Sequence, residues 1–288
     1  MTGFVERSWA TPDGLRLSGR DYAGEGGEAH LPVICLHGLT RNARDFEDVA
    51  PAFAATGRRV LALDVRGRGG SGWDPDPMNY VLPVYARDVI GWARALGVAR
   101  AAFVGTSMGG LIMLALAVAA PELMASAVLN DIGPKIAPEG LARIAGYAGG
   151  SAAVADWSEA AAYARRTNGA AFPDYGESDW QAFARRLFRE QGGRLSLDYD
   201  PAIAVPMKTP PPQPAPDPWA LFDALAKDRP LLLVRGALSD LLAPATRDEM
   251  QARAPHMRVA EIADVGHAPM LTEPEAARAM HTFLGEVD

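Results

Sequence analysis

The stretch GTSMGG at residues 105–110 decides how this chain is interpreted. It follows an apolar run at 101–104, which predicts a β-strand, and it opens an apolar stretch at 108–119, which predicts a helix. A G-x-S-x-G pattern between a strand and a helix is typical of a tight turn that exposes a nucleophilic serine. Glycine suits such a turn because it has no Cβ to collide with neighbouring backbone. Ser107 is therefore a candidate nucleophile; the alternative is a glycine-rich turn with an idle serine.

Strand-like and helix-like segments alternate on both sides of this turn. Short apolar runs predict strands at 31–36, 59–63, 101–104, 125–129, 230–234 and 258–262. Helical patterns fall between them at 46–55, 84–96, 108–119, 246–253 and 273–284. Continuous apolar strands separated by helices form a parallel sheet that is covered on both faces. The chain is therefore predicted to have an α/β fold with a mostly parallel, doubly wound sheet.

The alternation is interrupted between residues 132 and 218. This segment carries helical patterns rich in Ala and Arg, and it closes with prolines at 206, 210, 211, 212, 214, 216 and 218. Such a stretch cannot be a helix interior and predicts an extended linker. We therefore expect a core formed by 1–131 and 219–288, with 132–218 inserted as a mostly helical cap. Two independent domains are the alternative, but the late strands are too few to form a sheet alone.

A serine is a weak nucleophile at neutral pH, so it needs a base, and that base needs an orienting acid. His267 lies in a loop directly after the last predicted strand, and Asp240 lies shortly after the strand at 230–234. Both side chains are expected at the edge of the sheet where Ser107 emerges. Asp131 ends the strand at 125–129 and is the alternative acid, unless it serves as a turn or helix-capping carboxylate.

Five segments in order resemble those of the α/β-hydrolase fold serine hydrolases with a helical cap, a group that includes carboxylesterases and C–C hydrolases. The segments are 37–39, 64–71, 105–110, 236–240 and 266–267. The resemblance covers nearly the whole chain and is loosest across 132–218. It implies an α/β-hydrolase core with the acid at Asp240, the commoner position, rather than at Asp131. The serine at 107 argues against dehalogenase and epoxide hydrolase chemistry, which needs a carboxylate nucleophile.

The resemblance also assigns roles to two loops near the serine. The backbone N–H groups of Leu39 and Met108 would form an oxyanion hole, and His37 would be a structural residue that fixes its loop. The glycine-rich run at 64–72 would be a structural turn. It lacks the spacing of a phosphate-binding loop, so nucleotide binding is excluded. Arg68, between two glycines of this run, departs from the commoner form of the turn.

The composition narrows the class of partner. The 288 residues include 28 Lys and Arg against 35 Asp and Glu, and a net charge of −7 disfavours nucleic acid and anionic membranes as partners. The single cysteine, Cys35, excludes an internal disulfide, and the five histidines form no close pair, so no metal or other cofactor is expected.

We expect no signal peptide, because residues 1–7 lack a basic start followed by an apolar run. The longest apolar stretch, 111–120, is about half the roughly 20 residues that a membrane helix needs. We expect a cytoplasmic protein with a small-molecule partner and no indication of a homo-oligomer.

These residues predict a cofactor-free hydrolase of small or medium-sized carboxylic esters that acts through an acyl-enzyme on Ser107. Relatives with the same triad cleave carbon–carbon bonds of ring-fission diketones, open lactones or act as haloperoxidases, so these reactions are alternatives. A ligand-binding protein with little turnover is an alternative of another class.

The aromatic residues of the insertion and its return are expected to line the substrate pocket, if they are not ordinary packing residues. They are Tyr147, Trp157, Tyr163, Trp180 and Trp219. The arginines at 143, 165, 166, 185 and 186 would either hold an acidic substrate or form a solvated face.

Overall fold

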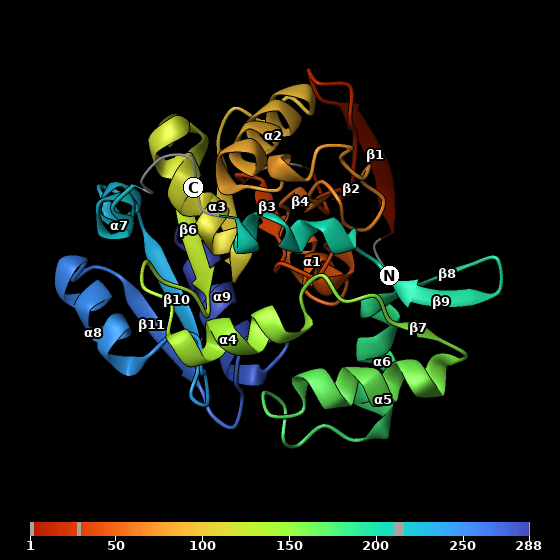
Figure 1. The fold of residues 1–288 in the computed structure, drawn as a ribbon. Helices are drawn as coiled ribbons and strands as arrows, with labels where there is room; N and C mark the ends of the chain where they lie inside the picture. The colour runs from red at the N-terminus through yellow and green to blue at the C-terminus, as the bar shows by residue number, and fades with distance from the viewer. Residues whose placement is uncertain (1–2, 28–29, 210–215, 288) are drawn as a thin grey trace.

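The computed structural model describes residues 3–27, 30–209 and 216–287. Its centre is an eight-stranded sheet with the strand order β1-β2-β4-β3-β5-β6-β10-β11 (Figure 1). The strands are β1 (Phe4–Ala10), β2 (Arg16–Tyr22), β3 (Val33–Leu36), β4 (Val60–Asp64), β5 (Ala101–Thr106), β6 (Met124–Asn130), β10 (Leu231–Gly236) and β11 (Arg258–Ile262). Neighbouring strands from β4 to β11 are parallel, whereas β1 with β2 and β2 with β4 are antiparallel. The predicted mostly parallel α/β sheet is confirmed.

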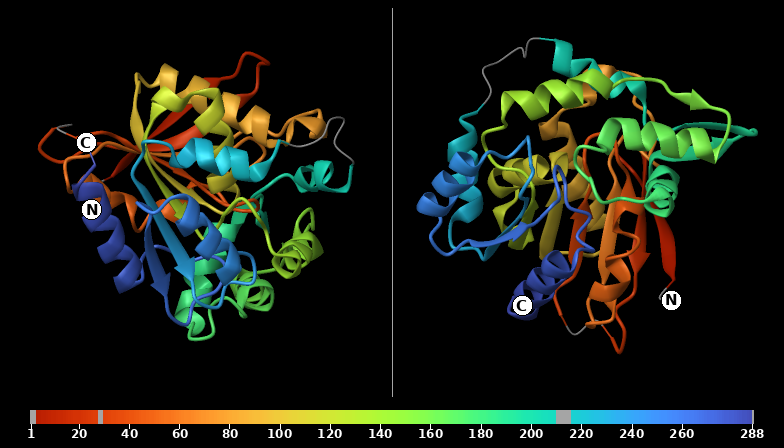
Figure 2. Two further views of the ribbon diagram at one scale, coloured as in Figure 1. Left: turned by 90° about the vertical axis from the view of Figure 1, so that its left-hand side faces the viewer. Right: turned by 90° about the horizontal axis from the view of Figure 1, so that it is seen from below.

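Helices cover both faces of the sheet. Along β3 the side chains alternate, so Val33 and Cys35 belong to one buried cluster and Ile34 and Leu36 to the other. The first cluster is covered by α1 (Ala50–Ala54) and α9 (Pro274–Gly285). The second is covered by α2 (Leu82–Ala95), α3 (Met108–Ala119), α7 (Pro218–Ala226) and α8 (Pro244–Arg253). In the left view of Figure 2, α9 in dark blue and α7 in cyan lie on opposite sides of the strands.

The sequence does not predict the hairpin of β1 and β2, because neither strand has an apolar run; β2 is mostly buried, but its residues are largely polar. Six of the seven residues of β1 are exposed, so this edge strand has no apolar run to detect. The six strands that were predicted are each buried on both faces or on one, and their observed bounds differ by a few residues at most.

Between β6 and α7 the chain leaves the sheet and forms the inserted segment, residues 132–217. It contains α4 (Pro138–Tyr147), α5 (Trp157–Asn168) and α6 (Glu177–Leu187). It also contains a small antiparallel sheet, which the mostly helical prediction missed. The order of this sheet is β7-β9-β8, from β7 (Ala153–Val154), β8 (Phe188–Gln191) and β9 (Arg194–Leu197).

The proline-rich stretch is more structured than an extended linker. Pro206 begins a short 3₁₀-helix that ends at Lys208. Pro218 is the first residue of α7, where proline is favoured because an N–H at that position has no acceptor within the helix and its loss removes no hydrogen bond. Since α7 packs on α3, Pro218 belongs with the core helices. The prolines at 210, 211, 212 and 214 lie outside the described residues.

Loops that follow the carboxyl ends of three strands hold the inserted segment. After β3, the side chain of Asn42 donates to the carbonyl of Arg186. After β4, the backbone at Gly67 and Gly69 bonds to residues 200 and 198, and after β11 the N–H of Gly266 donates to the carbonyl of Ala171. The inserted segment therefore covers the carboxyl ends of the parallel strands, and in Figure 1 its helix α4 lies across the end of β6.

Candidate active site

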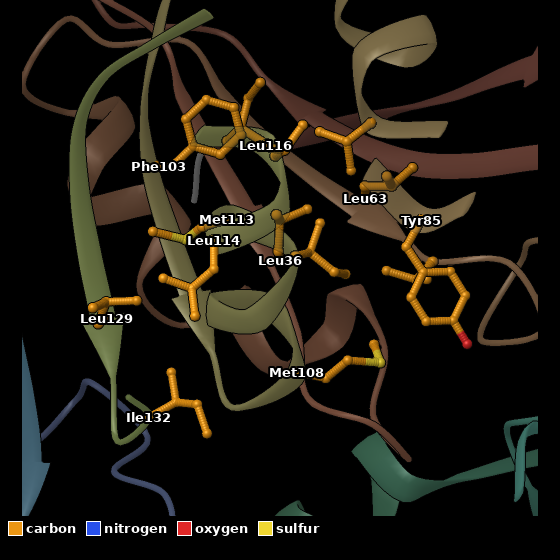
Figure 3. Close-up of a cluster of buried hydrophobic side chains, with 14 of the residues drawn as sticks. Leu36, Leu63, Tyr85, Phe103, Met108, Met113, Leu114, Leu116, Leu129 and Ile132 are labelled. Carbon is orange, nitrogen blue, oxygen red and sulfur yellow. The ribbon is translucent and has the colours of Figure 1, made fainter. Parts of the chain in front are cut away.

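Ser107 lies at the sharp turn between β5 and α3. Its backbone has φ 51° and ψ −114°, which a non-glycine residue rarely adopts. A Cβ at Gly105 would lie 2.3 Å from Sδ of Met113, and a Cβ at Gly109 would lie 2.0 Å from the carbonyl oxygen of Leu36. Figure 3 shows Leu36 of β3 and Met113 of α3 in the same buried cluster. Close packing therefore requires glycine at 105 and 109. The positive φ of Ser107 is a strained backbone conformation, and strain in a non-glycine residue is typical of functional sites.

A continuous chain of hydrogen bonds runs from Ser107 into the protein. Nε2 of His267 lies 2.9 Å from Oγ of Ser107, and Nδ1 of His267 lies 2.8 Å from Oδ2 of Asp131. Because the carboxylate accepts, Nδ1 carries the proton and Nε2 is left as the acceptor that faces the serine hydroxyl. The arrangement is that of a nucleophile, a base and an orienting acid.

The carboxylate of Asp131 is completely buried and fully hydrogen-bonded. Its Oδ1 accepts the backbone N–H of Gly236 at 3.0 Å, and its Oδ2 accepts the hydroxyl of Ser239 at 2.6 Å in addition to Nδ1 of His267. Three donors, from Gly236, Ser239 and His267, thus hold the carboxylate against the imidazole. Ser239 is a residue of the site that the sequence analysis did not single out.

Asp240 forms no hydrogen bond with His267, whose Nδ1 bonds to Asp131 instead, and the prediction that Asp240 orients this histidine is wrong. Its carboxylate forms a bidentate ion pair with Arg143 of α4, with Nη2 to Oδ1 at 2.8 Å and Nε to Oδ2 at 2.5 Å. The hydrogen bonds from Arg143 hold the pKa of Asp240 below its usual range, although partial burial acts in the opposite direction. Asp131, the alternative acid, makes the predicted contact instead.

The order of the strands explains why Asp131, and not Asp240, bonds to His267. Strand β6 lies between β5, which carries Ser107, and β10, and Asp131 is the first residue after β6. Asp240 lies four residues beyond β10, where its backbone carbonyl accepts the N–H of Gly140 from the inserted segment. The sequence feature that could have pointed to Asp131 is its place directly after an apolar, completely buried strand.

The two expected oxyanion donors are free to bind a ligand. Met108 is the first residue of α3, so its N–H has no acceptor within the helix. Neither this N–H nor that of Leu39 donates to another residue in the part of the chain that the structure describes. Gly38, which precedes Leu39, lies beside the serine: a Cβ placed there would be 3.8 Å from Cβ of Ser107.

His37 has the structural position that the resemblance implied. It is completely buried, its Nε2 accepts the N–H of Val65 at 3.0 Å, and its Nδ1 lies 2.8 Å from the carbonyl of Gly38. Burial lowers the pKa of His37 to about 4. The neutral ring therefore ties the loop after β3 to the loop after β4.

A pocket opens next to Ser107 and His267. Arg41 and Asp45 form a bidentate ion pair in its wall, and the guanidinium of Arg41 lies 4.2 Å from the ring centroid of Phe183. The pocket is lined by Gly38, Leu39, Thr40, Arg41, Asp45, Phe46, Thr106, Ser107, Ile144, Tyr147, Tyr163, Thr167, Asn168, Phe172, Phe183, Leu187, Leu197, Tyr199, His267, Ala268, Pro269, Met270 and Leu271. Both the core and the inserted segment thus contribute to a mainly apolar wall with a few polar groups, as in small-molecule sites.

Of the aromatic residues predicted to line this pocket, Tyr147 and Tyr163 do so and three do not. Trp157 lies under the guanidinium of Arg185. Trp180 packs against other aromatic rings of the inserted segment, and Trp219 packs against Phe222 within α7. Spacing along a helix does not tell which face meets the pocket, because the inserted segment has its own buried core.

The arginines of the inserted segment are occupied elsewhere or lie outside the pocket lining. Arg143 is paired with Asp240, and Arg186 with Glu47 and Asp48. Arg185 and Arg166 stack on Trp157 and Tyr163. The pocket's cationic residue is Arg41, which the sequence analysis did not name.

Comparisons with known proteins agree with this geometry. The family model described as "alpha/beta hydrolase fold" matches residues 32–274. The chain belongs to this family. The alpha/beta hydrolase from Novosphingobium aromaticivorans, a solved structure, is 42% identical, superposes with a TM-score of 0.91, and the match covers 99% of each chain.

Among relatives of curated function, the 3-hydroxybutyrate-oligomer hydrolase of Cupriavidus necator is 37% identical over 262 residues, which is 88% of each chain. The structure of E-2-(acetamidomethylene)succinate hydrolase has a TM-score of 0.80 at 24% identity and shows a shared fold. The similarity to these alpha/beta hydrolases indicates that this chain is a hydrolase. Within the described residues, no helix combines the length and apolar character needed to cross a membrane.

Proposed function

We propose that this alpha/beta hydrolase cleaves carboxylic esters through an acyl-enzyme. Ser107 is the nucleophile, His267 the base and Asp131 the acid that orients His267. The observation that carries the proposal is the hydrogen-bond chain from Asp131 through His267 to a serine in a strained turn. The backbone N–H groups of Leu39 and Met108, both without another acceptor among the described residues, are the proposed oxyanion donors.

The reaction follows from these positions. Oγ of Ser107 forms a bond to the ester carbonyl carbon, and its proton passes to Nε2 of His267. The carbonyl oxygen takes the negative charge and is stabilised by the two backbone donors. When the tetrahedral intermediate collapses, the alcohol leaves with the proton from His267. Water then attacks the acyl-enzyme, gives its proton to His267, and the carboxylic acid leaves Ser107, which recovers its proton.

The substrate is proposed to be an ester of small or medium size. The pocket has apolar walls, from side chains such as Ile144, Phe172 and Leu197, and a few polar groups that include Arg41 and Asn168. The Cupriavidus necator relative is named for hydrolysing 3-hydroxybutyrate oligomers. Short oligomers of this hydroxy acid are linked by ester bonds, so we propose them as the first substrates for this chain.

The test is a panel of substrates whose hydrolysis is followed by titration of the released acid. It contains the dimer and trimer of 3-hydroxybutyrate, ethyl butyrate, a γ-lactone and a dienoic ring-fission diketone. The wild-type protein is compared with Ser107→Ala and with Ser158→Ala, since Ser158 is an exposed serine on α5.

We expect hydrolysis of one or more esters, with loss of at least about a thousandfold in Ser107→Ala and none in Ser158→Ala. Turnover of the diketone without turnover of any ester would show that the same triad hydrolyses carbon–carbon bonds rather than esters. Ester hydrolysis that Ser107→Ala retains would contradict the proposed mechanism, and binding without any turnover would favour a ligand-binding protein.

A further inference from the structure

Arg68 occupies an unusual place behind the proposed oxyanion hole. It lies in the loop after β4 between Gly67 and Gly69, whose φ values are 76° and 54°. A Cβ at Gly67 would collide with the ring of Tyr80, so the loop needs glycine to bring Arg68 inward. The loop is also bonded to the inserted segment, because the N–H of Gly69 donates to the carbonyl of Asp198. The backbone that carries Arg68 is therefore held by packing against Tyr80 on one side of it and by the hydrogen bond to Asp198 on the other.

The guanidinium of Arg68 is completely buried and touches both residues of the oxyanion hole. Nε donates to the carbonyl oxygen of Leu39 at 2.9 Å, and Nη2 lies 3.5 Å from Sδ of Met108. Nη1 donates to the carbonyl of Arg66 at 2.7 Å and to the hydroxyl of Tyr85 at 2.9 Å. Figure 3 labels Met108 and Tyr85, the two side chains that the guanidinium of Arg68 contacts, on the same side of the buried cluster.

All of these acceptors are neutral. No carboxylate lies within 4 Å of the Arg68 guanidinium among residues 3–27, 30–209 and 216–287. The neighbouring Arg66, which is also completely buried, is paired with three carboxylates, those of Asp13, Asp74 and Asp88. The two arginines thus differ: carboxylates match the charge of Arg66. The charge of Arg68 instead meets neutral oxygens and the rings of Tyr80 and Tyr85, whose centroids lie 5.6 and 5.1 Å from its Cζ, and no carboxylate of the described residues matches it.

A buried charge without a counterion is unfavourable in the resting protein and favours any process that brings a negative charge near it. The proposed reaction does so, because the tetrahedral intermediate places a negative oxygen at the N–H groups of Leu39 and Met108. Burial is the main cause of the lowered pKa of His37, and the positive charge of Arg68 acts in the same direction. The field of Arg68 therefore reaches the loop that carries Leu39.

We propose that Arg68 is a positioning residue that fixes Leu39 and Met108 for oxyanion binding, and that its unmatched charge stabilises the anionic intermediate. This inference rests on the proposed function. It predicts that a substitution of Arg68 weakens the binding of tetrahedral anions and leaves the binding of neutral ligands nearly unchanged.

The test compares two inhibitors of similar size. Butylboronic acid is trigonal and neutral in solution; Oγ of Ser107 adds to its boron, the proton passes to His267, and the adduct is a tetrahedral anion that mimics the intermediate. N-ethylbutyramide is a neutral, unreactive analogue of ethyl butyrate. The inhibition constants of both are measured for the wild type, Arg68→Met, Arg68→Gln and Arg68→Lys, and folding of each variant is checked by near-ultraviolet circular dichroism.

A matched control is Arg229, another buried arginine whose hydrogen bonds go to carbonyl oxygens, among them those of Met124 and Leu225. It caps the end of α7, away from the pocket lining. Arg229→Met should leave the ratio of the two inhibition constants unchanged. Arg68→Gln serves if Arg68→Met does not fold, since glutamine keeps a donor but removes the charge.

For Arg68→Met or Arg68→Gln we expect butylboronic acid to bind roughly ten- to a hundredfold more weakly, and N-ethylbutyramide to change by less than about threefold. Arg68→Lys, which keeps the charge, should recover part of the loss. Equal changes for both inhibitors, or no change for either, would overturn the proposal. If Ser107→Ala binds butylboronic acid as tightly as the wild type, the proposed function itself fails, and this result is separate from the behaviour of the Arg68 variants.

Discussion

The choice between two carboxylates is the sharpest consequence of the structure, and Asp131→Asn tests it. Asparagine fits the site, because it tolerates the positive φ of residue 131, which is 54°. Its amide oxygen takes the place of Oδ1, which accepts the N–H of Gly236, so its NH₂ group takes the place of Oδ2. There it faces Nδ1 of His267, which must then give up its proton to act as acceptor. The imidazole changes tautomer, and Nε2 points a hydrogen at Ser107.

In that tautomer Nε2 cannot accept the serine proton, so the nucleophile loses its base. We expect kcat/KM to fall by about 10³- to 10⁴-fold, which corresponds to about 4–5.5 kcal/mol of transition-state stabilisation. Asp240→Asn is the matched control. Its carboxylate is paired with Arg143 at a position where the two side chains are 36% and 26% exposed, and such pairs contribute about 0–1 kcal/mol. Its kcat/KM should change by less than about threefold.

The assay is the steady-state hydrolysis of the best ester in the panel, measured for both variants at several pH values and normalised to folded protein. If Asp240→Asn loses activity by several orders of magnitude while Asp131→Asn keeps it, the assignment of the acid is wrong. Equal, small losses in both would show that His267 does not depend on either carboxylate.

Three stability predictions follow from other buried groups. Burial lowers the pKa of His37 from its usual value of 6.5 to about 4 in the folded protein, so the unfolded chain takes up the proton first as the pH falls. The free energy of unfolding should therefore decrease by about 3 kcal/mol between pH 6.5 and pH 4, and His37→Gln should remove this decrease in urea titrations at several pH values. Gly109→Ala should leave little soluble, folded protein, because its Cβ would meet backbone at 2.0 Å, whereas Gly146→Ala, with open space around its Cβ in α4, should raise stability by about 0.4–1 kcal/mol in thermal unfolding. Arg66→Met leaves buried carboxylates unpaired and should cost about 3–5 kcal/mol of unfolding free energy, while Arg253→Met, at a pair that is partly exposed, should cost less than about 1 kcal/mol; similar losses in both would contradict the argument.

Much of the core could be predicted from the sequence because its strands are buried and apolar. The run at 101–104, the turn at Ser107 and the helix at 108–119 each agree with their neighbours, and local patterns of this kind are read reliably. His267 followed from its place after the last strand. The hairpin of β1 and β2 was missed because neither strand has an apolar run: β1 is exposed, and β2 is mostly buried but rich in polar residues.

What the sequence could not decide depends on the exact end of a strand and on side-chain direction. Asp131 and Asp240 both follow buried strands, but Asp131 comes directly after β6, the neighbour of β5, whereas Asp240 lies four residues beyond β10. There it pairs with Arg143, which is 97 residues away in the sequence. In the same way Trp180 and Tyr163 both lie on helices of the inserted segment, but only tertiary packing turns Tyr163 towards the pocket. Local sequence does not carry such long-range choices.

The central claim is that Ser107 is an activated nucleophile, and the most direct measurement is labelling with a fluorophosphonate, with the modified residue identified by mass spectrometry. The hydrogen-bond chain from Ser107 to Asp131 predicts rapid, stoichiometric labelling at Ser107 in the wild type. It also predicts loss of labelling in Ser107→Ala and His267→Ala. If folded wild-type protein is not labelled, or if another residue is labelled at the same rate in both variants, the proposed mechanism is contradicted.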